Sequence, residues 1–135
     1  MKKKLIISLK LIALMLLFLS VTTGCKKDKK EEEAKNNPSL VGEWGHVRSL
    51  GTGRNQVTQI TLNADGTGNE VIFNTSFSGA TTISDENIKW LSEKDVLKLI
   101  FNDGLVDEFQ FALSKDAKTL TLTNKSGDAK EFFKQ

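Results

Sequence analysis

The stretch that decides the fold is residues 57–73, which read VTQITLNADGTGNEVIF. In its first part the apolar Ile60 and Leu62 alternate with polar residues, which is the pattern of a half-buried strand. A second strand-like run, 68–73, follows after residues 63–67, whose residue types tolerate tight and left-handed turns. The stretch therefore predicts two antiparallel strands joined by a short turn.

The same pattern recurs along the chain after Pro38. Alternating or β-rich runs lie at 40–49, 57–62, 68–73, 77–83, 87–91, 96–101, 105–113, 119–123 and 129–133. No window of about 11 residues keeps the apolar spacing of an amphipathic helix, and only 84–87 leaves room for a brief one. Eight or nine short antiparallel strands with hairpin connections favour an all-β, up-and-down barrel over residues 38–135.

Residues 1–24 differ in composition from the rest of the chain. They hold four lysines and no acid, and the run from Leu11 to Val21 is 11 residues without a charge. As a helix this run would span about 16 Å, well short of a bilayer's apolar thickness of about 30 Å. Residues 1–24 therefore predict a cleaved secretory signal peptide, with an uncleaved anchor as the alternative.

Cys25 is the only cysteine, so the chain cannot form an internal disulfide. The stretch Val21-Thr22-Thr23-Gly24-Cys25 resembles the lipobox of bacterial lipoproteins, although Thr22 stands where that family usually has Leu. The resemblance implies cleavage between Gly24 and Cys25 and a diacylglyceryl lipid anchor on Cys25, with palmitate as an acyl chain. A free thiol is the alternative. Two or more acyl chains hold a protein stably at a membrane.

Residues 26–37, KKDKKEEEAKNN, contain a single apolar residue and cannot bury a face. We expect residues 25–37 to form a disordered, flexible tether behind the lipidated cysteine. A charged stretch in this place resembles the surface-export signals of lipoproteins in the Bacteroidota, and a soluble spacer is the alternative. Lys26 after the cysteine implies, by the sorting rule of enterobacterial lipoproteins, no retention at the inner membrane. We expect a protein of the bacterial cell envelope, at the outer membrane or cell surface.

The charge of the folded part excludes one class of partner. Residues 38–135 hold ten basic and thirteen acidic residues, a net charge of −3, so the basic excess of the whole chain belongs to the leader and tether. Nucleic-acid binding usually needs a basic face on the folded domain. We therefore expect no nucleic-acid partner, and we expect a monomer.

Residues 40–44, Leu-Val-Gly-Glu-Trp, carry a Gly-x-Trp in the first expected strand. With the later turn at 63–67, Trp90 and the Phe-Phe-Lys near the end of the chain, this order resembles the lipocalin-like domains of small bacterial lipoproteins, and it covers most of residues 39–135. The second lipocalin motif includes a Tyr and has no counterpart, since the chain has no Tyr.

The lipocalin resemblance also implies roles for single residues. Gly42 and Trp44 would be the barrel signature, with Trp44 closing one end of the barrel. A basic residue of the last strand packs over that Trp in lipocalins, which implies Lys130 or Lys134 here.

The resemblance implies non-enzymatic binding of a small apolar or amphipathic ligand. The aromatic residues that could line the site are Trp44, Trp90, Phe101, Phe109 and Phe111. The same side chains could instead fill the barrel, since an eight-stranded barrel is only just wide enough for one small ligand. The protein would then be an interaction or inhibitor module of the cell envelope, working through segments 50–56 and 74–87.

Catalytic and metal-binding motifs are weak. His46 is the only histidine, and strand alternation puts it and Ser49 on opposite faces, so they form no catalytic pair. Residues 63–68, NADGTG, resemble the start of a calcium loop, but Asn74 stands where the distal Glu would fall. We expect no enzyme activity, no metal site and no cofactor.

Overall fold

The structure is a computed structural model that describes residues 36–135. The elements are a 3₁₀ helix η1 (Pro38–Leu40) and strands β1 (Gly42–Gly51), β2 (Arg54–Leu62), β3 (Thr67–Ser76), β4 (Gly79–Glu93), β5 (Val96–Phe101), β6 (Val106–Leu113), β7 (Thr119–Thr123) and β8 (Ala129–Lys134). The predicted all-β class is confirmed, with eight strands. The predicted signal peptide and all but the last two residues of the predicted tether lie outside the described residues.

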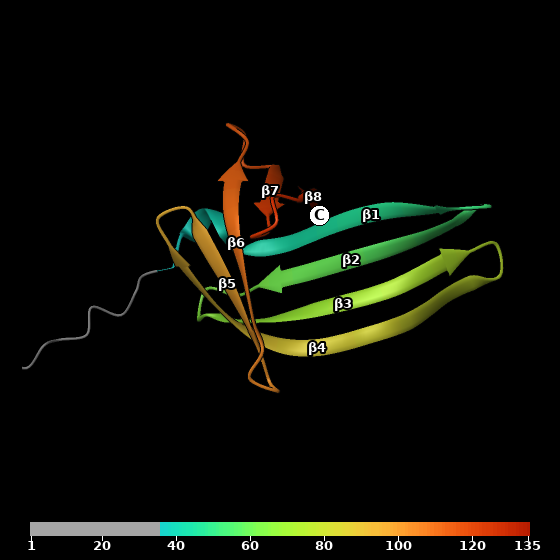
Figure 1. Ribbon diagram of the computed structural model, residues 1–135, viewed down its shortest axis with the longest axis horizontal. Helices are drawn as coiled ribbons and strands as arrows, with labels where there is room; N and C mark the ends of the chain where they lie inside the picture. The colour runs from blue at the N-terminus through green and yellow to red at the C-terminus, as the bar shows by residue number, and fades with distance from the viewer. Residues whose placement is uncertain (1–35) are drawn as a thin grey trace, which may run out of the picture. The chain divides into compact units, whose positions relative to one another are not determined.

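The eight strands form one closed antiparallel barrel in the order β1 to β8 (Figure 1). Each strand pairs with the next one in the chain, and β8 returns to pair with β1. The hairpin turn after β2 has the chemistry expected from its sequence: Gly66 has a φ of 82°, and Asp65 Oδ1 accepts a hydrogen bond from Thr67 N at 2.9 Å. The predicted up-and-down topology is therefore confirmed.

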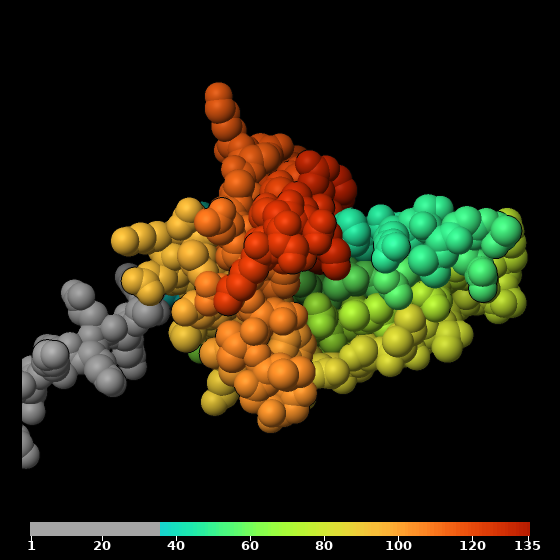
Figure 2. Space-filling model, in the orientation of Figure 1, coloured from blue at the N-terminus to red at the C-terminus, as the bar shows by residue number. Residues whose placement is uncertain are grey.

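The barrel is closed along a short belt only. β8 pairs with β1 at two positions, Trp44↔Lys134 and Gly45↔Phe133, and β5 pairs with β4 from Ile88 to Glu93. Past this belt β1–β4 continue as a four-stranded sheet, which we call the projecting sheet (residues 46–51, 54–59, 70–76 and 79–87). In Figure 2, β5–β8 cover one end of β1–β4, and the projecting sheet stands clear of them.

The hydrophobic core lies inside the belt. Its buried residues are Leu40, Trp44, Ile60, Leu62, Ile88, Trp90, Leu97, Leu99, Leu120, Leu122 and Phe132. They come from every strand except β3 and β6, and the register sets Trp44 opposite Ile60 and Trp90 opposite Leu99. Because each large apolar side chain contributes roughly 1.5–3 kcal/mol when fully buried, most of the stabilising burial is in the belt.

One expectation about the middle of the chain is wrong. Most of the run 77–83 and all of the run 87–91 belong to a single strand, β4, of 15 residues that begins at Gly79, and the brief helix considered at 84–87 does not form. In its place Asp85 pairs with Val71 and Glu86 pairs with Glu70. The cause is backbone pairing with β3, which holds these exposed polar residues in a strand although their own side chains give no strand signal.

Segments 50–56 and 74–87, the surfaces considered for a protein partner, are therefore mostly strand. They contain the two tight turns that end the projecting sheet, at residues 52–53 and 77–78.

Candidate functional site

Gly42 and Trp44, the pair expected as the barrel signature, lie at the start of β1 beside η1. Trp44 is fully buried, and its Nε1 donates to the carbonyl oxygen of Leu40 at 2.8 Å. The Nζ of Lys134 lies 5.2 Å from the ring centroid of Trp44, a cation–π contact. Of the two lysines that the resemblance implied, the structure places Lys134 over the ring. Gly42 has a φ of 139°, and a Cβ there would stand 3.0 Å from Cε of Lys134, so the glycine makes room for this lysine.

Trp90 anchors the chain that leads into the barrel. Its Nε1 donates to the carbonyl oxygen of Asn63 at 2.9 Å. Asn36 is paired twice with β4: its Nδ2 donates to Trp90 O at 3.1 Å, and its Oδ1 accepts from Ser92 N at 2.9 Å. Asn37 N donates to Ser92 Oγ at 2.6 Å. The last two residues of the predicted tether are thus bound to β4 beside η1. We call the part of the barrel around η1, Asn36 and Asn37 the plugged end.

The five aromatic residues expected to line a ligand site fall into two groups. Trp44 and Trp90 are 0% exposed and belong to the core. Phe101, Phe109 and Phe111 are half-buried and pack against that core. The two tryptophans therefore fill the barrel in this conformation, and the three phenylalanines are the members of the set that solvent reaches.

His46 has a structural position at the seam between β1 and β8. It lies directly after the last β1–β8 pair, its Nδ1 is 2.8 Å from the carbonyl oxygen of Glu131, and its ring centroid is 5.3 Å from that of Phe132. With Nδ1 bearing the proton, the ring donates to that carbonyl and extends the seam by one contact. These contacts give His46 a packing role at the seam.

On the inner face of the sheet, the surface changes from apolar to polar past the belt. Glu70 lies on this face, opposite Ile60 on one side and Glu86 on the other. Burial raises the pKa of the Glu70 carboxyl, the carboxylates of Asp107 and Glu86 raise it further, and Lys130 opposes them. Past the belt, the inner face therefore carries a group of acidic side chains around the partly desolvated carboxyl of Glu70. Lys130 lies close enough to lower the pKa of that carboxyl.

The outer face of the projecting sheet carries a row of apolar side chains. Side chains alternate between the faces of a strand, so Val47 lies opposite in direction to Trp44. The register sets Val47 beside Val57, and Val57 beside Phe73, in one row across β1–β3. Val47 is 61% exposed. Past the belt, the apolar face of the sheet is thus the outer one, which no element among the described residues covers.

Among residues 36–135, at least two hollows lie on the outside of the barrel. The larger, of about 880 Å³, is lined by Asn36, Pro38, Val41, Ala64, Asp65, Gly66, Thr67, Lys89, Trp90, Leu91 and Ile100. It lies at the plugged end beside the attachment of Asn36. Asp65 has a lowered pKa because it accepts hydrogen bonds from the hydroxyl and the backbone N–H of Thr67, so it is already satisfied within its own turn.

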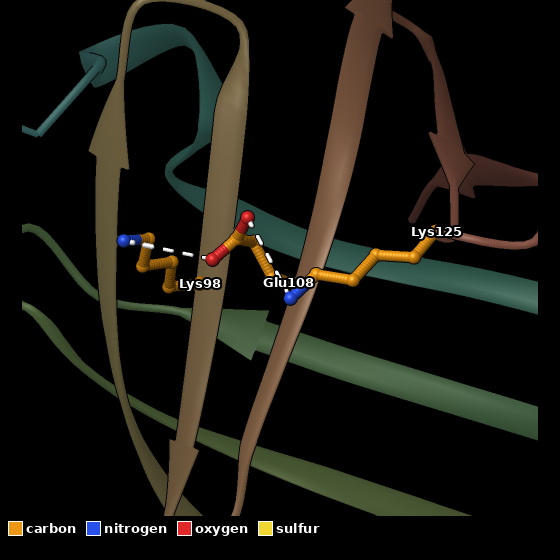
Figure 3. Close-up of polar contacts among 3 residues, drawn as sticks. All are labelled: Lys98, Glu108 and Lys125. Atoms are coloured by element: carbon orange, nitrogen blue, oxygen red, sulfur yellow. Dashed lines mark ion pairs between the residues drawn. The ribbon is translucent and has the colours of Figure 1, made fainter.

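The smaller hollow, of about 320 Å³, borders β6 and the turn after β7. Figure 3 shows the charged group at its rim, in which Glu108 reaches Lys98 at 3.6 Å and Lys125 at 4.0 Å. These three side chains are at least a third exposed, and exposed ion pairs contribute about 0–1 kcal/mol. The group is a solvated surface network.

The predicted lipidation and cleavage site, Gly24 and Cys25, lies outside the described residues. Within residues 36–135, no helix has the length and apolar content that a membrane crossing requires. The same part of the chain holds no group of three or more His, Cys, Asp or Glu side chains arranged to bind a metal ion.

Comparison of the chain with models of known families and with curated proteins gave no match in either case. What stands established is the class: an eight-stranded, antiparallel, up-and-down β-barrel, consistent with a lipocalin-like fold.

The feature that sequence reasoning missed is the projecting sheet. A signal for it exists in β2, where the apolar residues change from odd to even positions between Val57 and Ile60. Because side chains alternate between the two faces of a strand, this change means that the apolar side chains of β2 lie on its outer face near Val57 and on its inner face from Ile60 onward.

Proposed function

We propose that the protein is a lipid-anchored, non-enzymatic module of the bacterial cell envelope that binds a protein partner through the projecting sheet. The anchor is the diacylglyceryl group expected on Cys25, at the outer membrane or cell surface. The filled barrel serves as a rigid support, and β1–β4 carry the contact surface away from it.

A single observation carries this proposal. Past the belt, no element among the described residues covers the outer face of the projecting sheet, and this face is apolar along Val47, Val57 and Phe73. Exposed apolar surface of this kind, rimmed by polar residues, is typical of protein interaction sites. The tip adds Phe77, which is 96% exposed.

The test is recovery of a partner from membranes of cells that produce the tagged full chain. Val47→Asp places a charge on the outer face of the projecting sheet, and Leu91→Asp, at a side chain that is 44% exposed on the belt, is the matched control. We expect a protein to be recovered in stoichiometric amount with the parent chain and with Leu91→Asp, and at least tenfold less with Val47→Asp. A second, differently tagged copy of the chain is included so that self-association is detected. Equal recovery with all three chains contradicts the proposal.

Binding of a small amphipathic ligand inside the barrel is a second candidate. It is supported by the incomplete burial of Phe101, Phe109 and Phe111. Native mass spectrometry of the chain extracted from its host would then show a bound molecule, and Phe109→Ala would reduce its occupancy. Extracted protein that carries no such molecule contradicts this second function.

A further inference from the structure

The outer face of the projecting sheet is nearly uncharged. Residues that share this face by register include Val47, Val57, Val71 and Phe73, with polar uncharged neighbours between them. Among the described residues of this sheet, Asp85 is the one charged side chain on that face. Ile83 forms an irregularity in the β3–β4 ladder beside the row and is 55% exposed.

The rest of the domain surface carries charge. The inner face of the same sheet holds Arg48, Glu70 and Glu86, and the belt exposes groups such as Lys98 and Glu108. Residues 38–135 carry a net charge of −3, so two copies repel each other. The repulsion is smallest where the two facing surfaces hold few charges. The outer face of the projecting sheet is such a surface.

We infer that the occupant of this outer face is a second copy of the chain. Two projecting sheets pack outer face to outer face about a two-fold axis, in the manner of a β-sandwich, so that the row of Val47, Val57 and Phe73 in each copy is covered by the other. This inference rests on the proposed function, since it names the partner of the same surface. It departs from the monomer expected from the sequence.

The area of the face indicates a weak dimer that depends on the membrane. Four strands about 4.8 Å apart, over five or more residues of about 3.4 Å each, form a face of roughly 15 by 20 Å. Two such faces together cover roughly 600 Å², about half of the roughly 1,200 Å² at the lower end of the range for stable interfaces. Confinement of both copies by anchors in one membrane raises their effective concentration, and this confinement favours the dimer.

Cysteine cross-linking of the full chain in the membranes of its host tests the inference. Val57 and Thr58 are half-buried neighbours on opposite faces of β2. Packed sheets lie about 10 Å apart, within reach of a short bismaleimide. We expect Val57→Cys to give a product of twice the chain mass, at least fivefold more than Thr58→Cys. The parent chain, whose only cysteine is Cys25, the residue expected to carry the lipid, sets the background.

A second pair of variants guards against a folding defect. Val47→Cys and Arg48→Cys change exposed neighbours on opposite faces of β1, and we expect the same contrast between them. Equal cross-linking on both faces means random collision and overturns the inference, as does the absence of a dimer from both pairs. A product with the mass of a different protein, specific to Val57→Cys and Val47→Cys, overturns the second copy but supports the proposed function. The proposed function is contradicted as well only if Val47→Asp also leaves the recovery of partners unchanged.

Discussion

At the scale of single residues, the most constrained positions combine a large ring with one polar atom. Trp44 and Trp90 are each completely buried, and each indole N–H reaches a backbone carbonyl, of Leu40 and Asn63 respectively. A buried Trp needs such a partner, because an unpaired N–H in the core is costly. These two hydrogen bonds fix η1 and the turn after β2 against the core.

Trp44→Phe tests this constraint. The variant keeps an aromatic ring but leaves the Leu40 carbonyl without its donor and Lys134 with a smaller ring beneath it. We expect the free energy of unfolding to fall by about 1–3 kcal/mol, measured by urea denaturation. Leu91→Ala, on the exposed outer surface, should change it by less than about 0.5 kcal/mol. Unchanged stability of Trp44→Phe would contradict the role given to its hydrogen bond.

Glu70 gives a prediction about pH. Its pKa is raised from the usual 4.5, first by burial and then by Asp107 and Glu86. Between the usual and the raised pKa the folded state binds more protons than the unfolded state, so Glu70 makes stability fall as pH rises through that window. Above the window the carboxylate is charged in both states, and it lowers the free energy of unfolding by an amount that no longer depends on pH.

Glu70→Gln should therefore raise the melting temperature at pH 7 and flatten the fall in stability just above pH 4.5. Thermal melts between about pH 4 and pH 8 measure both effects, against Glu93→Gln at an exposed position of β4 as the control. A lower melting temperature for Glu70→Gln at pH 7 would mean that the carboxylate is stabilised rather than strained.

At the scale of elements, the sequence predicts what local chemistry controls. The turn at 63–67 and the strands on either side follow from alternation and from residues that favour turns, and both form as expected. The continuity of β4 across 84–86 was not predictable in this way, because polar residues lie on both faces of its exposed half, 79–87, which is held by pairing with β3. Likewise, Trp44 and a lysine above it followed from the lipocalin resemblance, whereas the apolar outer face depends on how short β5–β8 are.

Close contact between β2 and β3 leads to a prediction at Gly68. A Cβ at this position would run into the backbone carbonyl oxygen of Thr61, which cannot move aside without breaking the ladder. Gly68→Ala should therefore lower the free energy of unfolding by about 1–3 kcal/mol.

Gly45→Ala is the matched control for that measurement, because the atom that its Cβ would meet first is Nε2 of Gln135, the far end of a flexible side chain at the chain terminus. We expect little change there. Equal losses in the two variants, measured by chemical denaturation, would show that the contact at Thr61 is not what matters.

At the scale of the whole molecule, the belt and the projecting sheet differ in stability. The belt holds the buried core, and the projecting sheet holds half-buried and exposed side chains. Local opening is favoured where little apolar surface is buried and where strand edges have no partner.

Amide hydrogen exchange should reveal this difference within one strand. We expect residues 79–87 of β4 to exchange at least tenfold faster than residues 88–93, which β5 covers on the other edge. Mass spectrometry of overlapping peptic peptides makes the comparison. Uniform protection along β4 in the isolated chain would mean that the two parts open as one unit.

The attachment of Asn36 to β4 has a mechanical consequence. Asn36 bonds to Trp90 and Ser92, while the turn at 77–78 lies beyond the opposite end of the same strand, roughly 40 Å away at about 3.3 Å per residue. A pull applied between these points runs along the strands. Because hydrogen bonds in an antiparallel ladder are perpendicular to its strands, such a load shears many of them at once instead of unzipping them in turn. β4, an outer strand of the projecting sheet, therefore bears such a tension in shear along its pairing with β3.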